Sequence, residues 1–269
     1  MHISALCIYP VKSLGAVSLR EARVQPRGLE GDRRWMIVDT AGRFITRREA
    51  PVLAGIAISL MPDGGYRLRS DKGEAHLPQS FAEGKLQPVT VWGDTIPAWM
   101  VENDASRLIS AVAGRDLRLA YMPDDVHRAV SPAYARSGDQ VSFADGFPVL
   151  VASEASLAAL NATLALPVEM ARFRANIMLA GDELEPWAEA GWSGLDCGEV
   201  RLRLPKPCVR CIVITQQPET GERHEGNAVP MALRRLGQIR PEGVLFGMNA
   251  IAASPCGRIA LGDHVVPCV

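Results

Sequence analysis

Two cysteines and an arginine lie close together in the second half of the chain. The segment KPCVRC covers residues 206–211, so Cys208 and Cys211 bracket Arg210. A thiolate is a soft ligand that suits copper(I), zinc, iron–sulfur clusters and other thiophilic metals. A neighbouring cation stabilises the thiolate, and Arg210 therefore favours deprotonation of either sulfur. This spacing predicts at least one reactive thiolate.

Four interpretations of the motif are open. A zinc site needs a second Cys pair or a His pair at fixed spacing, but His224 and the remaining cysteines are scattered. A thioredoxin-like redox pair opens a helix, whereas the β-branched run at 212–215 favours a strand after the motif. Two buried structural thiols form the simplest alternative. The fourth interpretation, a single thiolate at a strand edge that binds an external group, is favoured. The scattered cysteines are Cys7, Cys197, Cys256 and Cys268.

The composition of the chain restricts its class and its partners. A chain of 269 residues can form one large or two modest domains. The net charge of −1 gives no reason to expect nucleic acid, an anionic membrane or strong charge steering. No run approaches the roughly 18 apolar residues of a membrane span. The absence of signal-peptide features and the six cysteines, too few for a disulfide scaffold, predict a cytoplasmic protein.

The positioning elements of the first half are short strands separated by turn residues, which predicts a barrel or sandwich. We expect a first domain at residues 1–120 and a second at 121–269, in a mainly β (α+β) fold with a few short helices. Three loops of the first half are basic: 9–13, 31–35 and 46–49. The predicted strands are Ile3–Tyr9, Ser18–Val24, Trp35–Val38, Phe44–Ile45, Ile56–Met61, Tyr66–Arg69, Val89–Trp92 and Ile96–Met100.

The second half combines strands with helices. An amphipathic helix at Asp104–Ala113 joins the halves, and Ser153 caps a helix that follows a strand at Val149–Ala152. A short helix is predicted at Pro230–Leu236 and a closing hairpin at Gly257–Val266. The alternation of Val200, Leu202 and Leu204 with arginines predicts a strand with one wet face that leads into the Cys motif.

Residues 172–177 place two arginines and an amide before a predicted strand at Ile177–Leu179. In a strand, Arg172, Arg174 and Asn176 share one face. This face binds an anion if it lines a pocket, and it is a solvated edge if it does not.

Six segments of the chain resemble the MOSC family, named after the C-terminal domain of molybdenum cofactor sulfurase. The first half resembles the MOSC N-terminal β-barrel domain, and the match spans nearly the whole chain. The pattern is similar to the mitochondrial amidoxime-reducing component and its bacterial counterparts. The six segments are YPVKS (9–13), GDRRW (31–35), FADGFP (143–148), SEASL (153–157), RFRANI (172–177) and KPCVRC (206–211).

The resemblance implies a molybdenum cofactor, a pterin dithiolene that carries a phosphate. It implies that Cys211 is the catalytic residue and the protein ligand to molybdenum. The cofactor-binding residues that it implies are Lys12, Ser13, Arg33, Asp145, Arg174, Asn176 and Arg210. The chain departs from the family at Gly146 and Phe147, where relatives often carry small hydroxyl residues.

The activity implied by this resemblance is reduction of N-hydroxylated compounds by a molybdenum oxidoreductase. The chain has no G-x-G-x-x-G fingerprint and no cluster-like cysteine spacing, so we expect a separate flavin or iron–sulfur protein as electron donor. The alternative is a non-catalytic protein that carries the cofactor or its sulfur.

Overall fold

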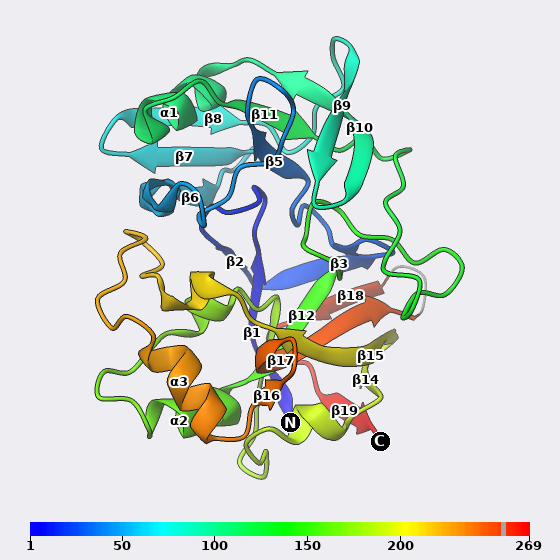
Figure 1. The fold of residues 1–269 in the computed structure, drawn as a ribbon. Coiled ribbons are helices and arrows are strands. Elements are labelled where there is room, and N and C mark those ends of the chain that lie inside the picture. Colours follow the sequence, from blue (N-terminus) through cyan, green and yellow to red (C-terminus); the bar gives the residue numbers. More distant parts are fainter. Residues whose placement is uncertain (254–256) are drawn as a thin grey trace.

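The computed structural model describes residues 1–253 and 257–269, so Cys256 lies outside the described residues. Strands dominate, and the described residues contain three α-helices, which confirms the mainly β (α+β) fold class (Figure 1). The strands are β1 (His2–Ile8), β2 (Val17–Leu19), β3 (Glu21–Gln25), β4 (Gly28–Leu29), β5 (Trp35–Val38), β6 (Ala57–Leu60), β7 (Tyr66–Ser70), β8 (Gly73–Leu77), β9 (Leu86–Val91), β10 (Asp94–Val101), β11 (Arg118–Tyr121), β12 (Val149–Ser153), β13 (Ile177–Ala180), β14 (Gly194–Cys197), β15 (Val200–Val209), β16 (Ile239–Arg240), β17 (Gly243–Ala252), β18 (Gly257–Ala260) and β19 (Val265–Cys268). The helices are α1 (Asp104–Ala113), α2 (Glu154–Asn161) and α3 (Ala228–Arg235), with 3-10 helices η1 (Pro51–Gly55), η2 (Met170–Phe173), η3 (Ala188–Gly191) and η4 (Ile212–Thr215).

A nine-stranded sheet forms the lower part of the molecule in Figure 1. Its path runs β19-β14-β15-β17-β12-β13-β1-β2, with β16 paired to β17. The strands pair antiparallel except β12 with β13, which are parallel. Strand β12 is buried along its whole length, as expected for an apolar strand in the middle of a sheet. Both α2 and α3 lie beside this sheet in the lower left of the view.

The upper part of the molecule contains two smaller sheets and α1 (Figure 1). One sheet has the order β5-β11-β10-β9, and the other has the order β6-β7-β8. A third small sheet, β18-β3-β4, joins the first half to the end of the chain. Pairing leaves each of these sheets open among the described residues, so a closed barrel is not confirmed.

The N-terminal strands belong to the sheets of the second half. Strand β1 pairs with β13, and β3 pairs with β18. The loop after β1 therefore starts beside residues near 177 although it is far from them in the chain. The predicted division into residues 1–120 and 121–269 stays a prediction.

Two predicted helix starts follow from side-chain capping. Asn103 Oδ1 accepts a hydrogen bond from Ser106 N at 3.0 Å, and α1 has the predicted bounds. Ser153 Oγ accepts from Ser156 N at 3.0 Å and caps α2, as predicted. Gly114 ends α1 with a left-handed φ of 67°, a conformation that glycine adopts without strain.

Several local predictions were wrong. Residues 212–215 form the 3-10 helix η4 rather than a strand, because β15 ends at Val209 and the chain turns at the Cys motif. Strands β18 and β19 pair with β3 and β14, so they do not form a hairpin. Phe44 makes an isolated bridge with Val38 instead of a strand. Strands β4, β8, β11, β14, β16 and β17 were not predicted.

No helix among the described residues combines the length and apolar character that a membrane crossing requires.

Candidate functional site

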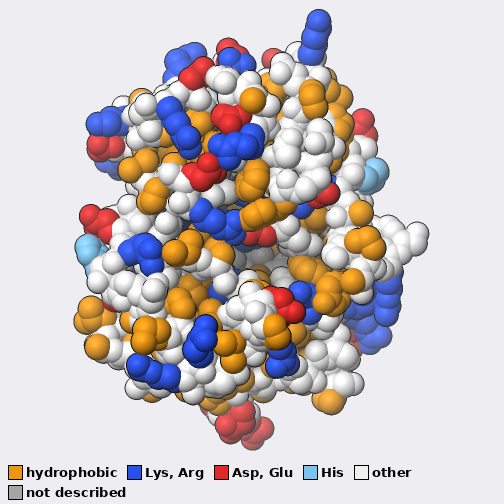
Figure 2. Space-filling model, viewed as in Figure 1, with side chains coloured by type: hydrophobic (Ala, Val, Ile, Leu, Met, Phe, Trp, Pro, Cys, Tyr) orange, Lys and Arg blue, Asp and Glu red, His pale blue; other side chains and the backbone are white. Residues whose placement is uncertain are grey.

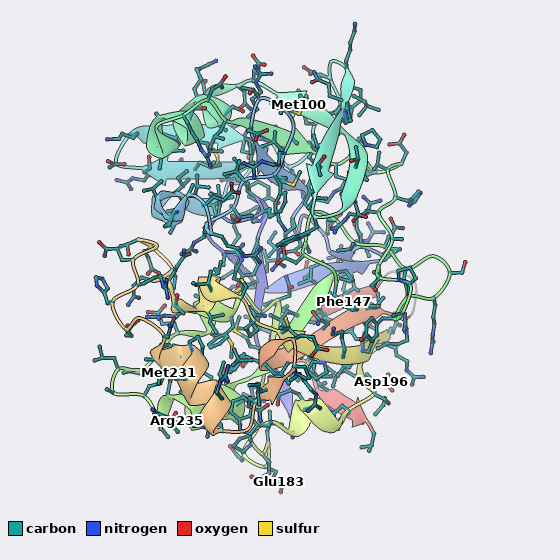
Figure 3. All side chains as sticks on the ribbon, in the orientation of Figure 1. Met100, Phe147, Glu183, Asp196, Met231 and Arg235 are labelled. Atoms are coloured by element: carbon teal, nitrogen blue, oxygen red, sulfur yellow. The ribbon has the colours of Figure 1, made fainter. Side chains whose placement is uncertain are left out.

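A cavity of about 840 Å³, including its open mouth, lies between the two parts of the molecule. Figure 2 shows a hollow between these parts, and Figure 3 labels Phe147, one of the lining residues, beside it. The described lining contains six cations and one carboxylate, so the cavity is strongly electropositive. The charged lining residues are Lys12, Arg33, Arg47, Arg48, Arg174, Arg210 and Asp145.

The cavity brings together every site residue predicted from the sequence. These residues come from five segments that are separated by up to two hundred positions in the chain, and the fold brings all of them to the lining of the same cavity. They are Lys12, Ser13, Arg33, Asp145, Arg174, Asn176, Arg210 and Cys211.

The two cysteines of the motif occupy different local structures. Cys208 lies in β15, where the pairing with β17 shifts register between Pro207 and Val209. Such a bulge re-aims side chains at a strand end. Cys211 follows the strand and is the N-cap residue of η4. Both thiols are half-buried and both line the cavity.

Arg210 contacts only one of these thiols. Its Nη1 donates to Cys208 Sγ at 2.8 Å, and its Nη2 donates to the carbonyl oxygen of Phe173 at 2.6 Å. The sequence placed Arg210 beside either sulfur, and the structure gives its hydrogen bond to Cys208. Cys211 is left facing the cavity, with no cation hydrogen-bonded to its sulfur among the described residues.

Lys12 is buried and fixes the loop that carries Asp145. Its Nζ donates to the carbonyl oxygen of Phe143 at 2.7 Å and forms an ion pair with Asp145. Burial lowers the pKa of Lys12, and Asp145 opposes this shift. Burial would raise the pKa of Asp145, but Lys12, Arg48 and Trp92 outweigh it and hold that pKa well below its usual range. Because the Asp145 side chain is 60% exposed, solvent screens this pair and weakens its effect on stability.

Arg128 supports the same loop from behind and was not predicted from the sequence. Its guanidinium donates to the carbonyl oxygens of Ser142, Ala144 and Asp145 at 3.0, 2.6 and 3.1 Å. Its Nε donates to Asp94 at 2.7 Å. A planar group with five donors suits such a set of acceptors. The sequence carries no signal for this role of Arg128, because the three carbonyl groups come together only in the folded chain.

Arg33 is held in place by a buried carboxylate. Its Nη1 donates to Asp32 at 2.5 Å, and the other carboxylate oxygen of Asp32 accepts from Tyr9 N at 2.8 Å. Burial raises the pKa of Asp32, and the hydrogen bonds and charge of these partners oppose it. Arg33 adopts a left-handed φ of 46°, which is uncommon for a residue other than glycine. Its hydrogen bonds to Asp32 and Asn176 hold it in this conformation.

Asn176 is the buried junction of the site. Its Oδ1 accepts from Arg33 at 2.9 Å and from Leu150 N at 3.1 Å. Its Nδ2 donates to the carbonyl oxygen of Cys7 at 3.0 Å and to Asp32 at 3.1 Å. The side-chain amide is thus fully used by the protein, and its position lets it hold Arg33 toward the cavity. Direct contact with a ligand stays a prediction.

Arg174 is a half-buried cation with little compensating charge. Its Nη1 donates to the carbonyl oxygen of Leu14 at 2.7 Å, and its guanidinium lies 4.1 Å from the centre of the Tyr9 ring. Burial, followed by repulsion from Arg33, lowers the pKa of Arg174 to about 9, with a further contribution from Arg47. An anion in the cavity would relieve this cost of burying like charges.

The predicted shared face of residues 172–176 was wrong. Met170–Phe173 form η2, and Arg174 turns into the left-handed region with a φ of 56°. Arg172 therefore points away from the cavity and pairs with Glu225. Its Nη1 and Nη2 donate to the two carboxylate oxygens of Glu225 at 2.9 and 3.0 Å. Arg174 and Asn176 line the cavity, and Arg172 does not.

Arg47 is a further lining cation that the sequence did not identify as a site residue. It is buried, its Nη2 donates to the carbonyl oxygen of Gln217 at 2.7 Å, and its Nε has no hydrogen-bond partner. Burial lowers its pKa to about 10. The basic loop at 46–49 was the available signal. Arg48 lies at the mouth, with its guanidinium 4.6 Å from the centre of the Trp92 ring.

The comparisons with known proteins agree with this geometry. Residues 1–116 match the MOSC N-terminal beta barrel domain, and residues 138–266 match the MOSC domain. The mitochondrial amidoxime reducing component 2 of Rattus norvegicus is 30% identical over 98% of this chain and 82% of its own length. The chain belongs to the MOSC family. The resemblance drawn from six segments is thereby confirmed.

Other relatives of this MOSC protein carry related names. The mitochondrial amidoxime-reducing component 1 of Homo sapiens is 29% identical, over 98% of this chain and 82% of the human protein. The molybdenum cofactor sulfurase of Oryza sativa subsp. japonica is 25% identical over 82% of this chain, but the match covers only 29% of the rice protein. The MOSC chain described here thus matches a small piece of a much longer sulfurase.

Proposed function

We propose that this MOSC protein binds a molybdenum cofactor in the cavity and reduces N-hydroxylated compounds with electrons from a separate protein. The observation that carries the proposal is the convergence of six cations and a thiol, Cys211, on one cavity. The names of the amidoxime-reducing relatives support the substrate class. We further propose that the protein is cytoplasmic and that the two predicted domains contribute opposite walls.

The lining fits the chemistry of a phosphorylated pterin dithiolene. A phosphate requires cationic donors, and arginine meets it with two parallel hydrogen bonds. Half-buried Arg174 and buried Arg47 form no ion pair with a carboxylate among the described residues, and Arg47 Nε has no hydrogen-bond partner. Cys211 offers the soft ligand that a thiophilic metal prefers.

Each residue would have a separate task. Cys211 would ligate the metal, while Arg33 and Arg174 would bind the phosphate end. Lys12 and Asp145 would keep the loop at 142–147 closed over the cofactor, because their ion pair links it to the loop after β1. Phe147 and Val149 would exclude water from the reacting centre. When bound, the cofactor supplies a two-electron redox centre that accepts an oxygen atom.

The alternative function is a non-catalytic carrier of the cofactor or its sulfur. The sequence match to a molybdenum cofactor sulfurase supports this alternative. A carrier must release its cargo, whereas the many buried contacts around Arg33 and Asn176 favour a fixed site. A reductase reduces many substrate molecules per bound cofactor, whereas a carrier reduces none, so a turnover assay distinguishes the two functions.

The test is reduction of benzamidoxime by the purified protein loaded with molybdenum cofactor. Dithionite-reduced methyl viologen serves as the electron donor, and benzamidine is measured by chromatography. We expect many turnovers per bound molybdenum. A protein that retains molybdenum and yields no benzamidine would exclude the reductase and favour the carrier.

A further inference from the structure

A groove on the outer face of the Cys motif lies between η4 and α3. It opens to solvent next to the cavity wall and is built from the end of the motif, the start of η4 and one side of α3. Its lining residues are Arg210, Cys211, Ile212, Thr215, Asn227, Pro230, Met231, Arg234 and Val244.

The groove and the cavity share the wall at Arg210 and Cys211, which line both. The next two residues separate the two spaces: Ile212 lines the outer groove, and Val213 lines the cavity. Thr215 Oγ1 donates to the carbonyl oxygen of Ile212 at 2.7 Å and fixes this turn. Cys211, the proposed metal ligand, therefore lies in the wall that the groove and the cavity share.

The groove has an apolar centre. Ile212 is 46% exposed and Met231 is 51% exposed, although both are large apolar side chains. Adjacent exposed side chains of this kind mark surfaces that contact another molecule. Pro230 lies beside them on α3. Methionine is adaptable and recurs at surfaces that bind partners transiently.

The rim of the groove is basic. The described residues that line it include Arg210 and Arg234 and no carboxylate. Arg234 and Arg235 are exposed in the last turn of α3 and form no ion pair with any residue that the structure describes. Figure 2 shows blue and orange side chains intermixed over the lower left, where Figure 3 labels Met231 and Arg235. The net charge of −1 conceals this local excess of positive charge.

We propose that the groove between η4 and α3 is the docking surface for an acidic one-electron carrier protein, which delivers electrons through Cys211. The proposal rests on the reductase function proposed above and identifies the partner and its site. An apolar centre with a charged rim is the usual anatomy of such an interface. Opposite charge steers the encounter, and a small contact area lets the carrier leave after transfer.

The electron balance is complete with this carrier. Two successive one-electron transfers, with two protons from solvent, convert an amidoxime to an amidine and one water molecule. Each transfer oxidises one molecule of the carrier. No dinucleotide is needed at the MOSC protein itself.

The experiment uses chemically reduced plant-type [2Fe–2S] ferredoxin, an acidic carrier, with the cofactor-loaded protein and benzamidoxime. The variant is Arg234→Gln with Arg235→Gln, which removes two charges outside the proposed cofactor site. The matched control is Arg67→Gln with Arg69→Gln, since both of these arginines are exposed on β7 in the upper part of the molecule. Thermal unfolding checks that all three proteins are folded alike.

We expect the ferredoxin-dependent rate of the Arg234 and Arg235 variant to fall roughly five- to tenfold at low salt. The difference from wild type should vanish at about 0.5 M salt, where charges on the two proteins are screened. The control should keep the wild-type rate within twofold. With methyl viologen as donor, all three proteins should react equally.

Three outcomes would overturn the docking proposal. One is a variant that accepts electrons from ferredoxin as fast as wild type at low salt. Another is a wild type that reacts with methyl viologen but never with ferredoxin. The third concerns binding of the wild-type protein to vesicles that contain 30% phosphatidylserine. If this binding depends on Arg234 and Arg235 and is tighter than binding to ferredoxin, the surface is a membrane contact. A wild type that fails with methyl viologen would instead refute the reductase function.

Discussion

Arg210 donates a hydrogen bond to Cys208 at 2.8 Å, although Cys211 is its immediate neighbour in the chain. The two thiols of the motif therefore have different surroundings. Cys208 is held by an arginine at a strand bulge, and Cys211 faces the cavity at the start of η4. Because the Cys208 sulfur is already hydrogen-bonded by Arg210, we propose that Cys211 rather than Cys208 would ligate the metal.

Replacing each cysteine separately tests this division. Cys211→Ala should abolish molybdenum retention, because the single protein thiolate of the proposed site is lost. Cys208→Ala should keep most of the metal, since Arg210 loses one hydrogen bond but retains that to Phe173. Metal analysis of the purified variants is the measurement. Equal loss in both variants would indicate a two-thiolate site such as zinc.

Lys12→Ala and Arg33→Ala should both weaken cofactor binding, but they should differ in stability. Removing Arg33 leaves buried Asp32 without its cation, which costs about 3–5 kcal/mol of unfolding free energy. Removing Lys12 should lower the free energy of unfolding by less, because the Asp145 carboxylate is 60% exposed and water solvates it. Urea unfolding gives the free energies, and Arg33→Ala with Asp32→Asn should recover most of the loss. Equal stability of the two single variants would contradict the buried pair.

Tyr9→Phe should reduce the sensitivity of the protein to alkaline pH. Burial raises the pKa of Tyr9 to about 12, whereas the unfolded chain has an ordinary tyrosine pKa near 10. Between these values the folded state holds more protons, so stability falls as pH rises, by at most ~1.4 kcal/mol per pH unit. Below pH 10 Tyr9 is protonated in both the folded and the unfolded state, so this loss of stability is absent there. Unfolding free energies from pH 8 to 11 should show a shallower decline in Tyr9→Phe, and an identical slope would refute the buried hydroxyl.

Arg128→Met should loosen the loop that carries Asp145. The substitution removes donors from three carbonyl oxygens, with an expected cost of ~3 kcal/mol. Arg258→Met is the control, because Arg258 and its partner Glu21 are both largely exposed, so a change below ~1 kcal/mol is expected. Urea midpoints measure both. A cofactor affinity in Arg128→Met that matches wild type would argue against the positioning role.

The cofactor-loaded protein should not oxidise NADH by itself. Activity should appear when a flavin or iron–sulfur reductase is added, or when methyl viologen replaces it. The reason is that the sequence contains no dinucleotide fingerprint and no set of cysteines spaced for a cluster. Absorbance at 340 nm follows NADH, and benzamidine is quantified in the same sample. NADH consumption coupled to benzamidine formation without any partner would refute this prediction.

The sequence by itself determined the elements that depend on near neighbours. Helix α1 was predicted because its apolar residues recur on one helical face. The start of α2 was predicted because Ser153 is a capping residue, and its hydroxyl accepts a hydrogen bond from the amide three residues further on. The strands β5 and β12 were predicted because their apolar runs are continuous. The site residues were identified from segment chemistry and family resemblance, and the fold gathers all of them into one cavity.

Only the tertiary structure decided which side chains meet. Arg172 and Arg174 are two residues apart, yet one pairs with Glu225 and the other enters the cavity, because Arg174 leaves the extended conformation. The roles of Arg47 and Arg128 depend on carbonyl groups that come near only after folding. Such contacts join positions far apart in the chain, and their energies depend on burial and charge in three dimensions. Residue types and their spacing therefore determine which chemical groups this protein offers. The path of the folded chain determines which of those groups contact one another.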